Sequence, residues 1–266
     1  PSLVGSEMCI RDRAGEGRGR RAHGAEAYAT ALRAATCALR HNPRHMALPG
    51  FATLANHPTA TLDRLALAIA VELRPRVDVD GTLDELDRLG LELATAVDQT
   101  DGSPEAQAAA CTELLGDTYG FEGDEDEYDH PDNSMLDLVV ARRSGLPILL
   151  SAVYVEVARR ARVQLEGVGL PGHFVVGHFG VKPPLLLDPF GGGRRVQGRV
   201  DPAHVRAWSA HETALRMLNN LVGSYERRGD IGRAIRAAEL RLLLPAAPGL
   251  RDELELGLKS IRARLN

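Results

Sequence analysis

The sequence predicts an α+β protein, with helices at the start, a small antiparallel sheet in the middle and further helices at the end. Three observations support this order. Apolar residues recur at helical spacing through residues 61–98, a long apolar helix and two short alternating segments follow between 146 and 188, and a helix–turn–helix pattern occupies 213–244. Since 44% of the 266 residues are hydrophobic, the chain can bury a sizeable core.

The first fifty residues are unlike the rest of the chain. The string LVGSEMCIRD at residues 3–12 resembles the translation of a transposon-end adapter used in preparing sequencing libraries. We therefore expect residues 1–13 to be translated adapter and exclude them from the fold. Residues 11–21 are rich in Gly and Arg, a composition typical of disorder. Residues 1–50 are accordingly predicted to be an artefactual or disordered extension, and the globular pattern begins at Phe51.

Helical spacing predicts three helices in the first part of the globular region, at residues 61–73, 82–98 and 104–119. Thr82 and Glu85 can form a capping box at the start of the second. Cys111, in the third, stands among alanines and leucines, which is typical of a small core side chain. An acidic segment at 121–132 lacks the spacing of a calcium-binding loop, so it is interpreted as a solvated loop.

A long apolar helix is predicted at residues 146–162. Pro147 suits a first turn, where its missing N–H would have had no partner. The helix is apolar over most of its circumference, which indicates that it is buried. A short helix at 135–142, capped by Asn133 and Ser134, precedes it.

Two short alternating segments, 173–176 and 185–188, predict strands of a hairpin. A four-residue loop at 179–182 would place His173 directly opposite Asp188, where side chains on one face approach closely enough for a carboxylate to orient an imidazole. The register decides this contact, because a slip of one residue would put the two side chains on opposite faces.

A buried helix followed by a strand His and a strand Asp is the arrangement of a Cys-His-Asp hydrolase or transglutaminase. In such enzymes the nucleophile stands at the helix N-terminus, which lowers its pKa. Here Pro147 or Ile148 occupies that position, and neither can act as a nucleophile. Ser151 lies one turn further along and is a weak candidate, because it would need a base close by.

The C-terminal region predicts helices at 213–227, 231–244 and 251–265, after a short helix at 202–208. Gly191, Gly192 and Gly193 are interpreted as a flexible turn, since no phosphate-binding motif follows them. One helix pair has near-tetratricopeptide spacing and cannot bury its apolar face alone, so it must pack on the main domain or on a partner. The abrupt end of such an array suggests a truncated C-terminus. The positions that carry this spacing are Leu221, Tyr225, Gly229, Ala234 and Ala238.

Three strings, NSMLDLVVARRSGLPILLSAVYVEVARR, GVGLPGHFVV and LLLDPFGGG, closely resemble the bacterial SirB family of regulators of SirC expression. The resemblance covers residues 52–250 and is most specific within 129–192. It implies a helical start, then a transglutaminase-like core with a papain-like layout within residues 51–210. Tetratricopeptide-like helices follow at 211–266.

The resemblance also assigns residues. The His and Asp of the transglutaminase superfamily match His173 and Asp188, whereas Pro147 or Ile148 stands in place of its Cys. The SirB pattern RRxGxPIxLS has no Cys there either, so the chain agrees with that family and departs from the catalytic superfamily. This implies a relic active site.

Charge and cysteine use exclude several functions. The net charge is −4 and the pI about 6.2, so neither nucleic acid nor a membrane surface is an expected partner. Cys9, Cys37 and Cys111 show no pairing pattern, which predicts a reducing, cytoplasmic location. We see no signal peptide, and no apolar run approaches the roughly 20 residues of a membrane span.

These observations favour a non-catalytic protein of regulation or protein–protein interaction, with protein partners held by the C-terminal helices. The alternative is a cryptic hydrolase or acyltransferase in which Ser151 or Cys111 attacks, His173 is the base and Asp188 orients it. The His–Asp pair can also simply satisfy two buried polar groups. A metal site would add His178, which is five residues from His173 and faces the other side of a strand, so neither a metal nor another cofactor is expected.

Overall fold

The computed structural model of the protein describes residues 47–198 and 200–264. Residues 1–46 of the predicted N-terminal extension, with the stretch expected to be translated adapter and with Cys9 and Cys37, lie outside the described residues. The first described helix, α2 (Phe51–Ala55), begins where the sequence pattern becomes globular.

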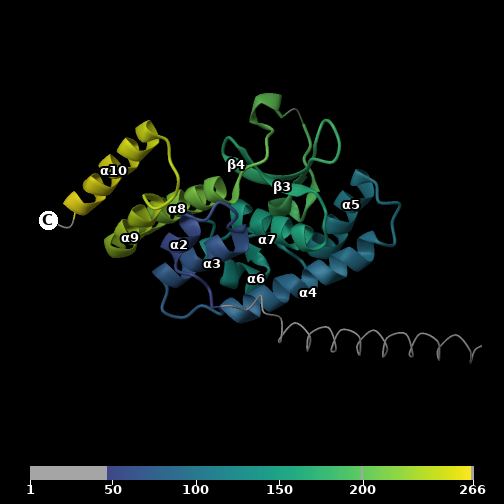
Figure 1. Ribbon diagram of the computed structural model, residues 1–266, viewed down its shortest axis with the longest axis horizontal. Coiled ribbons are helices and arrows are strands. Elements are labelled where there is room, and N and C mark those ends of the chain that lie inside the picture. Colours follow the sequence, from purple (N-terminus) through teal and green to yellow (C-terminus); the bar gives the residue numbers. More distant parts are fainter. Residues whose placement is uncertain (1–46, 199, 265–266) are drawn as a thin grey trace, which may run out of the picture. The chain divides into compact units, whose positions relative to one another are not determined.

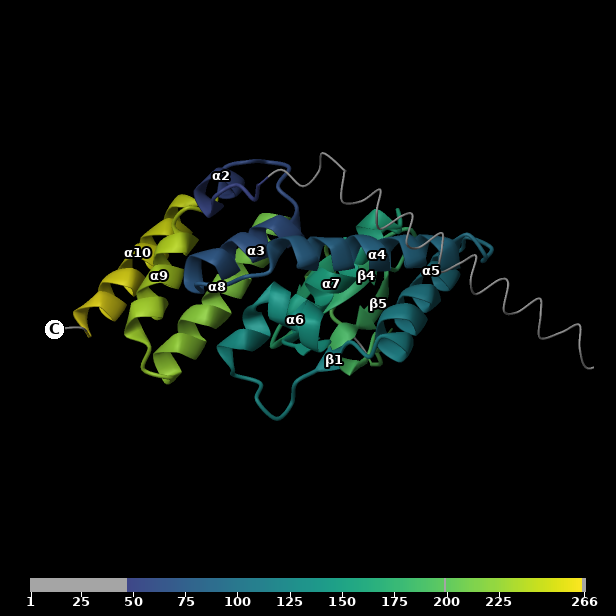
Figure 2. The same ribbon diagram turned by 90° about the horizontal axis from the view of Figure 1, so that it is seen from below.

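Helix α7 (Pro147–Arg160) is the central element, with the main sheet against one side and helices α3 (Leu62–Leu73), α4 (Val79–Val97) and α6 (Leu136–Arg142) against the other (Figures 1 and 2). Every residue of α7 from Pro147 to Ala158 is buried, as its apolar circumference predicted. This mixed arrangement of helices around a small antiparallel sheet confirms the predicted α+β class.

The main sheet is a meander of four antiparallel strands in sequence order. They are β3 (Leu165–Leu170), β4 (His173–His178), β5 (Leu185–Asp188) and β6 (Arg194–Arg195). Strand β3 was not predicted, because Gly167 and Gly169 weaken its strand pattern. A Cβ at Gly169 would lie 2.2 Å from the Trp208 ring, so the glycine admits the indole onto the strand.

The predicted hairpin register is wrong by two residues. Val176 pairs with Leu187 and His178 with Leu185, so the loop has six residues and not four. The two extra residues are Pro183 and Pro184, which have no N–H to donate to a ladder. A shift of two residues keeps every side chain on its face, whereas a shift of one would not.

The predicted caps of two helices are wrong, and the helices predicted to start at 213 and 251 begin at Ala210 and Pro248. Helix α4 begins three residues earlier, because the Asp78 carboxylate accepts a hydrogen bond from the Gly81 N–H at 3.0 Å, and Thr82 lies inside the helix. Asn133 and Ser134 do not cap α6, because they belong to the 3-10 helix η2 (Pro131–Ser134).

The third predicted helix is two elements, α5 (Pro104–Cys111) and the π-helix η1 (Thr112–Thr118). At its C-terminal end, Gly116 lies against the backbone of Gly192 with no room for a Cβ, which would come 2.0 Å from the Gly192 carbonyl oxygen. The remaining short elements are β1 (Glu122–Gly123), which pairs in parallel with β2 (Ser144–Gly145), and the 3-10 helices η3 (Pro189–Gly191) and η4 (Pro202–His204).

The C-terminal helices are α8 (Ala210–Arg227), α9 (Ile231–Arg241) and α10 (Pro248–Ala263). Helices α8 and α9 pack on each other and both contact α3, while α10 contacts α9 (Figures 1 and 2). The helix pair therefore buries its apolar face against the rest of the protein, as expected for a single unit. The domain boundary at 210 and the tetratricopeptide character of these helices stay predictions.

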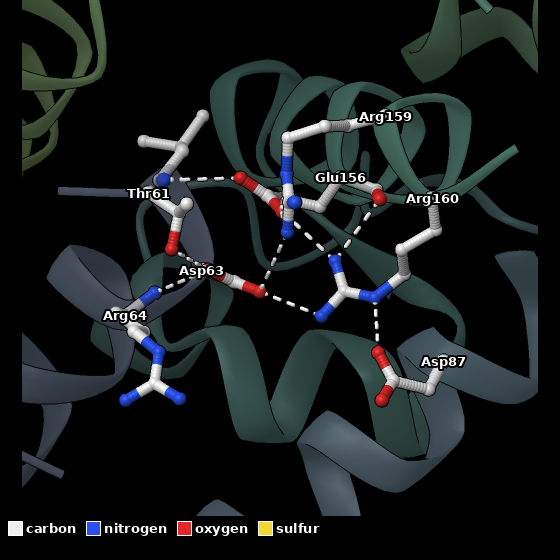
Figure 3. Close-up of polar contacts among 8 residues, drawn as sticks. Thr61, Asp63, Arg64, Asp87, Glu156, Arg159 and Arg160 are labelled. Carbon is white, nitrogen blue, oxygen red and sulfur yellow. Dashed lines mark hydrogen bonds and ion pairs between the residues drawn. The ribbon is translucent and has the colours of Figure 1, made fainter. Parts of the chain in front are cut away.

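A buried ionic cluster joins α3, α4 and α7 (Figure 3). Arg160 is at its centre. Its guanidinium donates to three carboxylates, those of Asp63 at 2.7 Å, Glu156 at 2.8 Å and Asp87 at 2.5 Å. Arg159 gives Glu156 a second hydrogen bond, at 2.8 Å. Asp63 and Glu156 are almost fully buried. Against burial, Arg160 and the Thr61 hydroxyl lower the pKa of Asp63, whereas burial and the nearby Asp63 charge raise the pKa of Glu156 despite both arginines.

Candidate functional site

His173 and Asp188 lie side by side at the ends of two neighbouring strands. His173 begins β4 and Asp188 ends β5, and His173 Nε2 is 3.0 Å from Asp188 Oδ1. With the register shifted by two residues, His173 and Asp188 are diagonal neighbours on the same face of the sheet and no longer directly opposite. Long side chains can still reach each other across this diagonal, so the contact forms. The two side chains are 34% and 30% exposed, so the pair is accessible to a ligand.

The Asp188 carboxylate is fixed in its ionised form. Oδ1 also accepts a hydrogen bond from the Phe190 N–H at 3.0 Å. Burial acts to raise the pKa of Asp188, but the hydrogen bond and charge of His173 and the backbone N–H groups outweigh it and lower the pKa. The carboxylate can therefore orient the imidazole, the role that the sequence assigned to it.

Aromatic rings and an arginine complete the surroundings of His173. The Phe190 ring stands edge-on to the imidazole at 6.3 Å between centroids, and Tyr128 stands against Phe190 at 5.9 Å. From α8, Arg216 Nη2 donates to the His173 carbonyl at 3.1 Å, and both its terminal nitrogens reach the Leu170 carbonyl. Sequence reasoning missed these three side chains, because they come from distant segments and belong to no motif.

The start of α7 has no side chain that could act as a nucleophile. The N-cap residue is Leu146, followed by Pro147 and Ile148. All three are buried, and none has a thiol, hydroxyl or other nucleophilic group. A cavity of about 200 Å³ lies beside Leu146, lined by polar side chains of the 128–134 segment and of α8.

The two alternative nucleophiles lie elsewhere. Ser151 is fully buried, and its hydroxyl is 3.5 Å from the Phe174 carbonyl oxygen, the outer limit for a hydrogen bond. Cys111 is fully buried too, and burial raises the pKa of its thiol to about 12, which keeps it protonated at neutral pH. In the described residues neither side chain forms a hydrogen bond to His173.

His178 is held apart from this pair. It ends β4, and its Nε2 lies 2.8 Å from Gln107 Oε1, while Nδ1 accepts the Gly180 N–H at 3.1 Å. Burial lowers the pKa of His178. Both ring nitrogens are therefore occupied, and no cluster of three His, Cys, Asp or Glu suited to a metal occurs within residues 47–198 and 200–264.

The fold and the His–Asp pair define a class of protein. The family model described as the transglutaminase-like superfamily matches residues 80–215, which include α7, His173 and Asp188. The chain belongs to this superfamily. No solved structure gave a significant match to the chain.

The chain is also similar to UPF0162 proteins of bacteria. It is 34% identical to the one from Xylella fastidiosa over 239 residues, covering 80% of this chain and 85% of that protein. It is 30% identical to the one from Pseudomonas aeruginosa over 203 residues, covering 70% and 72%. A shorter similarity, 28% over 133 residues, links 44% of this chain to 21% of mouse F-box only protein 21.

Proposed function

We propose that this chain is a non-catalytic member of its superfamily, of the SirB type, that acts in regulation by binding partners. The observation that carries the proposal is the start of α7, where Leu146, Pro147 and Ile148 stand in place of a nucleophile. An imidazole and a carboxylate alone can bind a ligand or orient water, but they cannot form an acyl-enzyme.

The partly exposed His173 supports a binding role for the His173–Asp188 site. Its ring is oriented by Asp188 and bordered by the edge of Phe190, so one polar group stands beside an aromatic surface. Sites that recognise small groups commonly combine an apolar wall with a few fixed polar groups.

A hydrolase or acyltransferase that uses Ser151 or Cys111 is the alternative. It requires the attacking atom to come within hydrogen-bond distance of His173, roughly 2.6–3.2 Å. Burial of both side chains and the raised pKa of Cys111 count against this alternative, because an attacking group must meet its substrate and lose a proton.

Electrophilic probes test the two functions against each other. We expect neither a fluorophosphonate nor iodoacetamide to label Ser151 or Cys111 in the folded protein, with labelled residues identified by mass spectrometry. The His173→Ala variant is the matched control. Labelling of either residue that disappears in this variant would establish the alternative and end the proposal of a non-catalytic site.

The partner is proposed to be a protein that contacts the C-terminal helices. Large apolar side chains are exposed in this region, with Leu256 of α10 at 65% exposure. We expect Leu256→Glu to remove partners recovered by affinity purification and mass spectrometry. Leu91→Glu on α4, at a position 47% exposed, is the control and should retain them. Equal recovery by both variants would contradict this assignment.

A further inference from the structure

A second cavity lies where α3 meets the turn between α8 and α9. Its volume is about 420 Å³, within the range of roughly 300–1,000 Å³ typical of small-molecule sites. The cavity is distinct from the His173–Asp188 pair, which does not line it. Three arginines line it from three elements: Arg74 at the end of α3, Arg228 at the end of α8 and Arg233 in α9.

The three guanidinium groups differ in how far they are already neutralised. Arg74 uses Nη1 to bind both oxygens of Asp137 at 2.9 Å, and Arg233 uses Nη1 to bind Asp230 at 2.6 Å. Each has further N–H groups, since a guanidinium carries five. Arg228 makes no side-chain hydrogen bond or ion pair to any residue in the described part of the chain.

The side chain of Tyr225 also lines the cavity. Tyr225 is only 4% exposed, and its hydroxyl has no hydrogen-bond partner among residues 47–198 and 200–264. Burial raises the pKa of Tyr225 to about 12, so the phenol stays protonated and can donate. Arg233 lies over its ring at 6.0 Å. The Tyr225 oxygen is not one of the buried unpaired atoms of the described residues, so it is open to the cavity and can donate to a ligand there.

Two carboxylates oppose the arginines. Asp230 is already bound by Arg233, through its guanidinium and its backbone N–H. Asp132 lies 3.8 Å from His130, which also lines the cavity. Asp137 binds Arg74 from outside the lining, so three arginines meet three carboxylates in all. What favours an anion is the set of available donors: the whole Arg228 guanidinium and the remaining N–H groups of Arg74 and Arg233.

The geometry points to a phosphate-binding site at this cavity, formed by Arg74, Arg228 and Arg233 together with the Tyr225 hydroxyl. A planar carboxylate is satisfied by one bidentate guanidinium, whereas a tetrahedral oxyanion takes donors from several directions, as three arginines on three elements provide. The cavity has room for more than the anion, so a phosphomonoester with a small organic group fits it better than free phosphate.

Calorimetric titration of the full chain tests this site, with inorganic phosphate, O-phospho-L-serine and acetate as probes in about 0.15 M salt, where loose surface binding is screened. We expect phosphoserine to bind with a Kd below about 1 mM, and acetate to give no binding. Tighter binding of phosphoserine than of inorganic phosphate would show that the site prefers a phosphomonoester. Equal binding would show that it recognises only the phosphate group. No binding of either phosphate overturns the proposal.

Variants locate the site. Arg228→Ala should weaken phosphate binding at least about tenfold, or roughly 1.4 kcal/mol. Tyr225→Phe, which retains the ring and its packing, should weaken it about three- to tenfold. Arg227→Ala is the control, because this neighbour lines the other cavity and pairs with Asp129 at 2.6 Å. Loss of binding in Arg227→Ala with none in Arg228→Ala would place the anion elsewhere and refute the site.

Discussion

The Arg160 cluster and the His173–Asp188 pair are both built from carboxylates and cations, yet they differ in burial and in the number of contacts. Arg160 is 13% exposed and holds three carboxylates, whereas His173 is 34% exposed and holds one. In the cluster arginines hydrogen-bond all three carboxylates, although burial and the Asp63 charge still raise the pKa of Glu156. In the pair, part of each side chain still meets solvent. The first arrangement therefore serves the fold, and the second is open to ligands.

The largest effect is expected from breaking the cluster. Arg160→Met keeps an aliphatic stem but leaves Asp63 and Glu156 short of compensation in the core, which should cost about 3–5 kcal/mol of unfolding free energy. Urea denaturation followed by circular dichroism measures it. Arg227→Met, whose ion pair with Asp129 is exposed on both sides, is the control and should cost about 0–1 kcal/mol. Similar small losses in both variants would show that the cluster is not a structural centre.

A smaller loss is expected at Arg216, which connects α8 to the strand that carries His173. Arg216→Met leaves the Leu170 and His173 carbonyls without this donor, at a cost of about 1–3 kcal/mol. Arg206→Met is a matched control, because Arg206 also lies over the Trp208 ring but is 56% exposed. Thermal unfolding compares them, and an equal change in both would contradict a specific role for Arg216.

Acid should weaken the fold through Glu85. Hydrogen bonds from Arg88 and Arg143 lower the pKa of Glu85 from 4.5 to about 2, although burial acts to raise it. Above pH 4.5 the carboxylate is ionised in both states and its contribution is complete. As the pH falls toward 2 the unfolded chain takes up the proton first, so this stability is lost. Between pH 5 and pH 2 we expect the unfolding free energy of Glu85→Gln to fall by about 1–2 kcal/mol less than that of the parent protein. Urea unfolding at several pH values measures both.

The smallest effects are expected at the exposed pair. His173→Ala should change the unfolding free energy by about 0–1 kcal/mol, because both side chains are partly solvated. Asp188→Ala should cost about 1 kcal/mol more, since it also leaves the Phe190 N–H without its acceptor. A loss at His173 as large as that at Arg160 would remove the distinction between the two regions.

Local patterns predicted the framework of the fold. The apolar circumference of residues 147–158 indicated a buried helix, and period-two alternation indicated β4 and β5. The His173–Asp188 contact was predicted for the right pair in the wrong register. Pro183 and Pro184 shifted the ladder by two residues, and an even shift preserves the face.

Long-range packing explains what the sequence could not predict. Gly167 and Gly169 argue against a strand until Phe174 is seen to pack at the first and Trp208, some forty residues later, at the second. Arg216 reaches carbonyls that are distant in sequence, and no local pattern indicates such a partner. The start of α4 was placed too late because Asp78 competes with Thr82 as a cap, and both are good cap residues.

The contact of α8 with α3 has a practical consequence for fragments of this protein. A fragment ending at residue 210 would lose α8, whose buried Leu218 and Leu221 belong to the common hydrophobic core. It would expose that apolar surface and lose the Arg216 support of His173. We therefore expect a fragment that retains the transglutaminase-like core to need α8, through Arg227, to keep this surface covered.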